Sequence, residues 1–256
     1  MSLLTDSLDK LHILCYRWGT RYGVEYVNNL CRMVARNLRI PHVFHCVTDS
    51  TEGLLPEVEA HELPDAGVSG NWNKLQTFKK NFLGLEGQYL VCMDLDLVIV
   101  GDLNFLTVTP EEPFLIARNW AKGIRGNSSV YRVQVGTLTH VWDDFIADPE
   151  GGIEQHFGKN RLCGDQNWLN HSIPRYAYFP EGKIVSFKRQ CHAKGHWLPG
   201  RLGKRLGLTT AAFGKAAPPP GAAIVSFHGD PLPPDVMHGR CGRWRHAPFV
   251  AEHWRQ

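Results

Sequence analysis

Hydrophobic positions along the first hundred residues follow two different spacings, and their alternation predicts an α/β fold. Apolar runs that are typical of buried strands lie at 11–16, 42–49 and 88–94, and residues 58–63 are a further strand candidate. Between these runs, residues 24–38 and 73–83 carry apolar side chains three and four positions apart, which is the spacing of a helix. Strands that alternate with helices in this way predict a mostly parallel central sheet with helices on both faces.

The rest of the chain mixes strands and helices in a less regular order. Further strand-like runs lie at 113–118, 128–135, 183–188 and 222–229, and helical patterns lie at 138–148 and 164–172. Residues 199–221 are rich in Gly, Pro, Lys and Arg and poor in large apolar residues, which predicts a basic, mobile loop or lid. Because this segment is interpreted as a loop rather than a linker, and no segment repeats, we expect one domain.

Two carboxylates interrupt the apolar stretch from Tyr89 to Val100. Either Asp94 or Asp96 alone would be explained as a cap on a turn at the end of a strand. In an extended strand, however, residues two apart point to the same face, where two carboxylates repel each other. A divalent cation removes that repulsion, and ligands of open parallel sheets bind at the carboxyl ends of the strands. The pair therefore predicts a metal site at this edge of the sheet, with an anionic ligand.

The composition is that of an ordinary globular protein. Of the 256 residues, 43% are apolar and 21% are charged, and no run reaches the roughly 18–20 apolar residues of a membrane span. Asp6 and Asp9 stand where an export signal would carry basic residues. The seven cysteines form no C-x-x-C pair, so their pattern indicates free thiols rather than a structural zinc site or a disulfide framework. We therefore expect a cytoplasmic protein.

Charge is distributed unevenly along the chain. Residues 181–256 hold 12 Lys and Arg against 4 Asp and Glu, whereas the whole chain has a net charge of only +3. This basic part could face phosphate groups, an anionic acceptor or a membrane surface, or it could be a solvated face. Residues 240–256, with Trp244 and Trp254, suggest a peripheral membrane contact near an anionic, lipid-linked acceptor. No motif of a nucleic-acid-binding module is present, and the sequence does not indicate an oligomeric state.

Several polar elements occur in order along the chain, namely Lys74, Asp94-Leu95-Asp96, Asn127-Ser128, Gly164-Asp165-Gln166 and His228-Gly229. This ordered set resembles that of the GT-A nucleotide-sugar glycosyltransferases, in particular glycosyltransferase family 8 and its bacterial relatives, over about residues 11–228. The resemblance implies a Rossmann-like GT-A fold in a single domain over 1–256. The nucleotide would be bound by about 11–103 and the acceptor by about 104–256.

The resemblance also implies an activity and its metal. A hexose would be transferred from a nucleotide sugar, with UDP as the expected nucleotide, to an acceptor that the sequence does not identify, and the anomeric configuration would be retained. Asp94, Asp96 and His228 match the ligands of Mn²⁺ or Mg²⁺. Asp165 and Gln166 match the element next to the transferred sugar, where we expect the catalytic groups. Asp165 could equally be a helix cap.

The same resemblance assigns residues to the donor. Those expected to bind it are Tyr16, Arg17, Trp18, Gly19, Asp49, Lys74, Asp94, Leu95, Asn127, Ser128 and Gly229. Tyr16 or Trp18 could stack on the nucleotide base, or both could belong to the core. Arg17 could contact phosphate, and Gly19 would permit a close approach of the backbone. Ser129 stands where the family often has Gly.

One departure from the family pattern and several rival functions stay open. Family 8 members often have a lysine after the late histidine, and residues 227–236 have none, so that Lys188, Arg189, Arg240 or Arg243 would supply the charge. Asp94 and Asp96 also match a motif of haloacid dehalogenase-type phosphatases, in which the first Asp is the nucleophile. That motif usually lies on the first strand, and here about ninety residues precede it. A noncatalytic GT-A protein that binds a nucleotide or glycan is a further alternative. A sugar nucleotidyltransferase would need a Gly-rich loop that the N-terminal region lacks.

Overall fold

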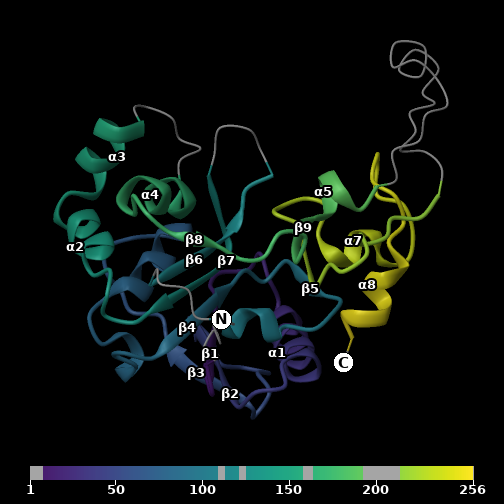
Figure 1. The fold of residues 1–256 in the computed structure, drawn as a ribbon, viewed down its shortest axis with the longest axis horizontal. Coiled ribbons are helices and arrows are strands. Elements are labelled where there is room, and N and C mark those ends of the chain that lie inside the picture. Colours follow the sequence, from purple (N-terminus) through teal and green to yellow (C-terminus); the bar gives the residue numbers. More distant parts are fainter. Residues whose placement is uncertain (1–7, 109–112, 121–124, 158–163, 193–213, 256) are drawn as a thin grey trace, which may run out of the picture. The chain divides into compact units, whose positions relative to one another are not determined.

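A computed structural model describes residues 8–108, 113–120, 125–157, 164–192 and 214–255 (Figure 1). These residues divide into two compact units, each made of segments that are far apart in the sequence. The first unit comprises 1–27, 40–95 and 104–179, and the second comprises 28–39, 96–103 and 180–256. Of the basic loop predicted at 199–221, residues 199–213 lie outside the described residues.

The first unit is built on a seven-stranded sheet with the strand order β3-β2-β1-β4-β7-β6-β8. Its strands are β1 (Leu11–Arg17), β2 (His42–Thr48), β3 (Val58–Glu62), β4 (Tyr89–Met93), β6 (Phe114–Arg118), β7 (Gly126–Gln134) and β8 (Ala177–Tyr178). The pairs of β4 with β7 and of β7 with β6 are antiparallel, and all other pairs are parallel. The predicted mostly parallel sheet is therefore confirmed, as are the strands predicted before residue 136.

Helices cover one face of this sheet with a continuous apolar core. They are the α-helices α2 (His140–Ala147), α3 (Pro149–Phe157) and α4 (Asp165–Ser172) and the 3₁₀ helices η1 (Gly70–Phe78) and η2 (Phe82–Gly84). A further 3₁₀ helix, η3 (Asn104–Thr107), has no residue in this core, and its Leu106 O accepts a hydrogen bond from Arg132 Nη1. Leu14 and Leu90 of the sheet pack with Phe78 of η1, Phe145 of α2 and Trp168 of α4. Because parallel strands in the middle of a sheet are buried on both faces, β1 is apolar almost throughout.

The α-helix predicted at residues 73–83 is wrong in type. The apolar side chains Leu75, Phe78 and Phe82 are buried as predicted, but residues 70–78 form a 3₁₀ helix. The backbone then becomes extended at Lys79, and Asn81 has a left-handed φ of 52°. An α-helix cannot continue through such residues. The apolar side chains therefore face inward from two separate 3₁₀ helices instead of one α-helix.

The apolar stretch around the two aspartates is not one strand. Strand β4 ends at Met93, and β5 (Leu97–Ile99) begins after Asp96 and belongs to a different sheet. The Asp94 N–H still donates to Ser129 O at 2.9 Å, whereas Val98 is already in register with Val225. The prediction that both carboxylates point to one face of a strand is therefore wrong, because neither residue lies in a strand.

The second unit contains a three-stranded sheet with the order β5-β10-β9. It comprises β9 (Ile184–Ser186), β10 (Ile224–Ser226), α5 (Phe187–Gln190), α7 (Pro233–Met237), α8 (Pro248–His253) and most of α1 (Val24–Asn37). The strands predicted at 183–188 and 222–229 are therefore shorter than expected. Among the described residues, no helix combines the length and the hydrophobicity needed to cross a membrane.

We predict that the close packing at the start of β7 makes Gly126→Ala destabilising. A Cβ atom at this position would lie 2.7 Å from Ile116 Cδ1 and 3.2 Å from Asn170 Oδ1. Because Ile116 is 1% exposed, it has little room to move, and overpacking of this kind costs about 1–3 kcal/mol. Urea unfolding measures this loss. Gly239→Ala is the control, since a Cβ there meets nothing within 4 Å, and an equal loss in both variants would contradict the prediction.

Candidate active site

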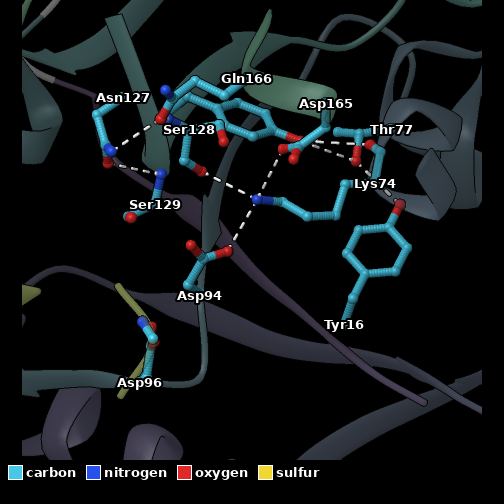
Figure 2. Close-up of polar contacts among 12 residues, drawn as sticks. Tyr16, Lys74, Thr77, Asp94, Asp96, Asn127, Ser128, Ser129, Asp165 and Gln166 are labelled. Atoms are coloured by element: carbon cyan, nitrogen blue, oxygen red, sulfur yellow. Dashed lines mark hydrogen bonds and ion pairs between the residues drawn. The ribbon is translucent and has the colours of Figure 1, made fainter. Parts of the chain in front are cut away.

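Lys74 lies at the centre of the first unit's polar site, where its ammonium group has three acceptors (Figure 2). The Nζ atom donates to Asp94 Oδ1 at 2.8 Å and to Ser128 O at 3.1 Å. It also forms an ion pair of 3.0 Å with Asp165 Oδ2. Two of the three N–H donors of the ammonium group are therefore used in hydrogen bonds, and the Asp165 carboxylate adds a close charge contact. One side chain from η1 therefore joins the end of β4, strand β7 and the start of α4.

The charge of this centre is set by burial and by two carboxylates. Burial alone would lower the pKa of Lys74, but the carboxylates of Asp165 and Asp94 outweigh it and hold the pKa well above its ordinary value. Lys74 is therefore protonated at neutral pH. The Asp165 residue is 4% exposed, and no hydrogen bond to its Oδ2 is present in the described part of the chain apart from the ion pair. Its charge is therefore balanced mainly by Lys74.

Two amide side chains next to this centre are locked in orientation by the backbone. The Ser129 N–H donates to Asn127 Oδ1 at 3.0 Å, so Asn127 Nδ2 is free to act only as a donor. This Nδ2 donates to Gln166 Oε1 at 2.8 Å, and the Ser128 N–H approaches the same oxygen at 3.4 Å. Because the Gln166 oxygen is the acceptor, its NH₂ group is the part that can face a ligand.

The loop predicted to receive the nucleotide base is tied to the end of β2. The Gly19 N–H donates to Asp49 Oδ2 at 2.7 Å, and Gly19 has a left-handed φ of 61°. Arg17 donates from Nε to Tyr22 O at 3.2 Å, so this side chain also stabilises the loop. Tyr16 is 5% exposed and its hydroxyl bonds Thr77 Oγ1 at 2.9 Å, which favours a role in the core. Trp18 is only half-buried, so its ring is the better candidate to stack on a base.

A second polar group lies in the second unit around His228. Asp96 Oδ2 accepts a hydrogen bond from the Gly229 N–H at 2.9 Å. His228 Nε2 lies 2.7 Å from Ser186 Oγ, and Lys188 Nζ donates to His228 O at 3.0 Å. His228 also has a left-handed φ of 41°, which is uncommon for a residue other than glycine and is often found at functional sites.

The three predicted metal ligands divide between the two groups. Asp94 belongs to the first unit, and Asp96 and His228 belong to the second, where the hydrogen bond to Gly229 brings them together. Carboxylate oxygens and one imidazole nitrogen are a donor set that suits Mn²⁺ or Mg²⁺. The contact of His228 Nε2 with Ser186 fits this role, because metal-binding histidines commonly use the second ring nitrogen in such a bond. Leu95, between the aspartates, is 3% exposed.

The residues that sequence reasoning missed are the partners of the predicted ones. Ser186 contacts His228, and Thr77 contacts Tyr16. Asn170 accepts a hydrogen bond from the Gly126 N–H at 2.7 Å and another from the Tyr176 hydroxyl at 2.7 Å. A pocket of about 380 Å³ lies beside Asn170 and is lined by Arg125, Pro174, Arg175, Tyr176 and Tyr178. Two guanidinium groups and two phenols in its wall suit a hydroxyl-rich or anionic group.

Of the two tryptophans expected at a membrane contact, Trp254 is buried in the second unit and Trp244 is half-buried. Trp254 is 8% exposed, and Trp244 packs against Phe187 and His192. Buried rings cannot insert into a bilayer, so the structure does not support a contact made through Trp254.

We predict that Lys74→Met lowers the free energy of unfolding by about 3–5 kcal/mol, because it leaves the buried Asp165 carboxylate without its partner. In the double variant Lys74→Met/Asp165→Asn the unpaired charge is gone, and most of the loss should be recovered. Lys80→Met, at an exposed lysine nearby, should change the stability by less than about 0.5 kcal/mol. Chemical denaturation of the four proteins checks this, and a double variant as unstable as Lys74→Met would contradict it.

We also predict that Asn127→Asp lowers the stability of the protein more than Gln166→Glu, although each variant exchanges one amide for a carboxylate. In Asn127→Asp an acceptor replaces the Nδ2 donor and faces Gln166 Oε1, which costs about 1–3 kcal/mol at this buried position. In Gln166→Glu the accepting oxygen is kept, so the loss of stability should be smaller. Urea denaturation of the two variants measures the difference, and a larger loss in Gln166→Glu would contradict the assigned orientations.

No protein-family model matches the chain, and no curated protein matches it in sequence. Solved structures match it over most of its length. The glycosyltransferase GlyE of Streptococcus pneumoniae TIGR4 matches with a TM-score of 0.61 and 12% identity, over 96% of this chain and 60% of GlyE. The galactosyltransferase LgtC, solved in complex with donor and acceptor sugar analogs, matches with a TM-score of 0.60 and 12% identity over 95% of each chain.

A third match is the bifunctional glycosyltransferase WbbM, with a TM-score of 0.54 and 10% identity over 91% of this chain and 48% of WbbM. The chain thus spans about 60% of the length of GlyE and about half that of WbbM. Identities this low establish the fold alone. The chain has the GT-A fold of these glycosyltransferases, as its sequence predicted.

Proposed function

We propose that this chain is a metal-dependent glycosyltransferase that moves a hexose from a nucleotide sugar, linked to UDP, to an acceptor. The observation that carries the proposal is the Lys74 centre, where Asp94 and Asp165 lie beside the amide pair of Asn127 and Gln166. In an open α/β sheet of this kind, ligands bind beyond the carboxyl ends of the strands, and Asp94 directly follows the parallel strand β4. LgtC, which shares the fold, was solved with donor and acceptor sugar analogs.

Transfer separates a nucleoside diphosphate from the anomeric carbon, so negative charge develops on the leaving group. Asp94, Asp96 and His228 would hold Mn²⁺ or Mg²⁺, which when bound stabilises that charge as a Lewis acid. Lys74 acts as a positioning residue in this proposal. Its ammonium group is already held by two hydrogen bonds and an ion pair, so it fixes the carboxylates of Asp94 and Asp165 in place rather than reaching the diphosphate itself.

Asp165 and Gln166 act on the sugar. The anomeric carbon gains positive charge in the transition state, as in glycoside hydrolysis, and the Asp165 carboxylate offsets it. The NH₂ group of Gln166 donates to a sugar oxygen, since its Oε1 already accepts from Asn127. Asn127 and Ser128 line the sugar, and the loop from Arg17 to Gly19 receives the base with Trp18 as the stacking ring. The reaction proceeds with retention, which we infer from the family resemblance.

Two other functions are weaker candidates. The comparisons do not favour the haloacid dehalogenase-type phosphatase, since GlyE, LgtC and WbbM are glycosyltransferases. The close pairing of Asp94 with a buried ammonium also argues against Asp94 as a nucleophile, because that charge lowers its reactivity. A noncatalytic GT-A protein would bind the nucleotide without turnover, so an assay for release of UDP distinguishes it from the enzyme.

We predict that UDP raises the melting temperature only when Mn²⁺ is present. A ligand at 100 times its Kd adds about 2.7 kcal/mol to the free energy of unfolding, which thermal denaturation detects readily. GDP, CMP and ADP serve as competing nucleotides. Asp94→Asn/Asp96→Asn should abolish the shift, whereas Asp143→Asn/Asp144→Asn, an exposed pair on α2, should keep it. UDP-linked hexoses are then assayed for release of UDP, and the anomeric configuration of the product is read by NMR.

Each other result would change the proposal in a defined way. A shift with a different nucleotide would replace UDP as the donor. A shift with UDP and Mn²⁺, but no turnover of any UDP-hexose, would support the noncatalytic protein. The absence of any nucleotide shift, together with hydrolysis of a generic phosphomonoester, would favour the phosphatase.

A further inference from the structure

Three histidines and a glutamate gather on neighbouring strands of the first unit, in a cluster that has no part in the proposed transfer. His12 lies on β1, His45 on β2, and Glu59 and His61 on β3. His45 is in register with Glu59, and alternate residues of a strand share a face, so Glu59 and His61 lie on the same face as His45. The cluster could not be predicted from the sequence, because only the register of three parallel strands brings its members together.

The polar atoms of this cluster lie within coordination reach of one another. His45 Nδ1 is 2.9 Å from His61 Nε2. The Glu59 carboxylate approaches both, at 3.7 Å from His45 Nδ1 and 3.9 Å from His61 Nε2. The ligand atoms of these three residues all lie within 4.8 Å of one another. On the other side of the His45 ring, Nε2 lies 2.9 Å from His12 Nδ1.

We propose that His45 Nδ1, His61 Nε2 and the Glu59 carboxylate form a binding site for a zinc-class divalent cation. Zinc binds imidazole nitrogen at about 2.0–2.1 Å, so that two such nitrogens in a tetrahedral site are about 3.3 Å apart. The two ring nitrogens therefore need to separate by only a few tenths of an ångström. The two imidazole nitrogens suit zinc better than Mg²⁺ or Ca²⁺, which prefer sites made of oxygen ligands.

The surroundings of His45 prepare it to bind a metal. When Nε2 carries the ring proton and donates it to His12, the lone pair is on Nδ1, which faces Glu59 and His61. Burial lowers the pKa of His45 to about 3, with further lowering from His12, His61 and Lys10, so the ring is neutral at pH 7. Zinc binding then requires no loss of a proton from this ring.

The other two ligands supply access and charge. The Glu59 side chain is 56% exposed and that of His61 is 23% exposed, whereas that of His45 is 3% exposed. Since β3 is the edge strand of the sheet, a cation can reach the cluster from solvent. The carboxylate offsets one of its two charges. The bound cation would link β3 to β2 through side chains, in addition to the backbone ladder.

The test measures zinc content and does not depend on transferase activity. The full chain is stripped with a chelator, dialysed against Zn²⁺ and analysed by mass spectrometry of the metal. We expect about one zinc per chain, with a higher melting temperature than the stripped protein. His61→Gln and Glu59→Gln should each weaken zinc binding at least tenfold. His12→Gln, which removes the partner of His45 Nε2, should weaken it by about 10–100-fold.

Matched variants separate this site from other metal-binding groups. Glu62→Gln alters an exposed carboxylate on the same strand, and His140→Gln alters a histidine on α2, so both should keep the zinc. Asp94→Asn/Asp96→Asn should also keep it, which makes the result independent of the donor metal. In the wild type, Co²⁺ should give the visible absorption of a tetrahedral nitrogen and oxygen site, and this band should be absent in His61→Gln.

Two outcomes would overturn the proposal. One is that the wild type retains no zinc after dialysis, which would leave the cluster as a chain of hydrogen-bonded imidazoles. The other is that His61→Gln and Glu59→Gln, folded by circular dichroism, bind zinc as tightly as the wild type. Both positions are partly exposed on an edge strand, so these variants are expected to fold.

Discussion

A buried positive charge must be neutralised by nearby groups of the protein. In the candidate site that charge is the Lys74 ammonium group, and the surrounding segments are arranged to meet this need. The residue is 5% exposed, so its ammonium group depends on acceptors supplied by the protein. They come from the turn after β4, from the backbone of β7 and from the first residue of α4. Because these three segments must reach one nitrogen atom, their ends are held together, and the amide pair of Asn127 and Gln166 is built on the same two elements, β7 and α4.

The two aspartates of the Asp-x-Asp segment are oriented by different partners. Asp94 is held by Lys74, and Asp96 by the backbone N–H of Gly229. The segment also leaves one sheet and enters another, since β4 pairs with β7 and β5 pairs with β10. A substitution that disturbs η1 therefore acts first on Asp94, and one that disturbs the loop after β10 acts first on Asp96. Two side chains that look equivalent in sequence have separate structural supports.

The strands of the sheet were predictable because strands in its interior are apolar almost throughout, as β1 and β4 are. The type of η1 was not, because Leu75, Phe78 and Phe82 have the same spacing whether the backbone is α or 3₁₀. The break between β4 and β5 was missed for another reason. It depends on pairing with β10, more than 120 residues later in the chain, and the local sequence pattern does not predict that contact.

The site shows the same division between local and distant information. Polar residues at the ends of strands, such as Asp94, Asp49 and His228, were predictable from their place in the chain. Their partners were not, because the three acceptors of Lys74 and the contact of Ser186 with His228 arise only when distant segments meet. The histidine cluster is the extreme case, since His12 and His45 are 33 residues apart and contact only across the sheet.

The place of β3 at the edge of the sheet has a consequence for the protein in a crowded solution. An edge strand presents unpaired backbone groups, which can recruit the edge of another molecule and start aggregation. Here the strand is short, Glu59 and Glu62 are exposed on it, and the exposed Glu57 directly precedes it. A second copy that approached edge to edge would bring two rows of carboxylates together, and their repulsion opposes that contact. The charged edge strand thus opposes edge-to-edge association of two copies of the chain.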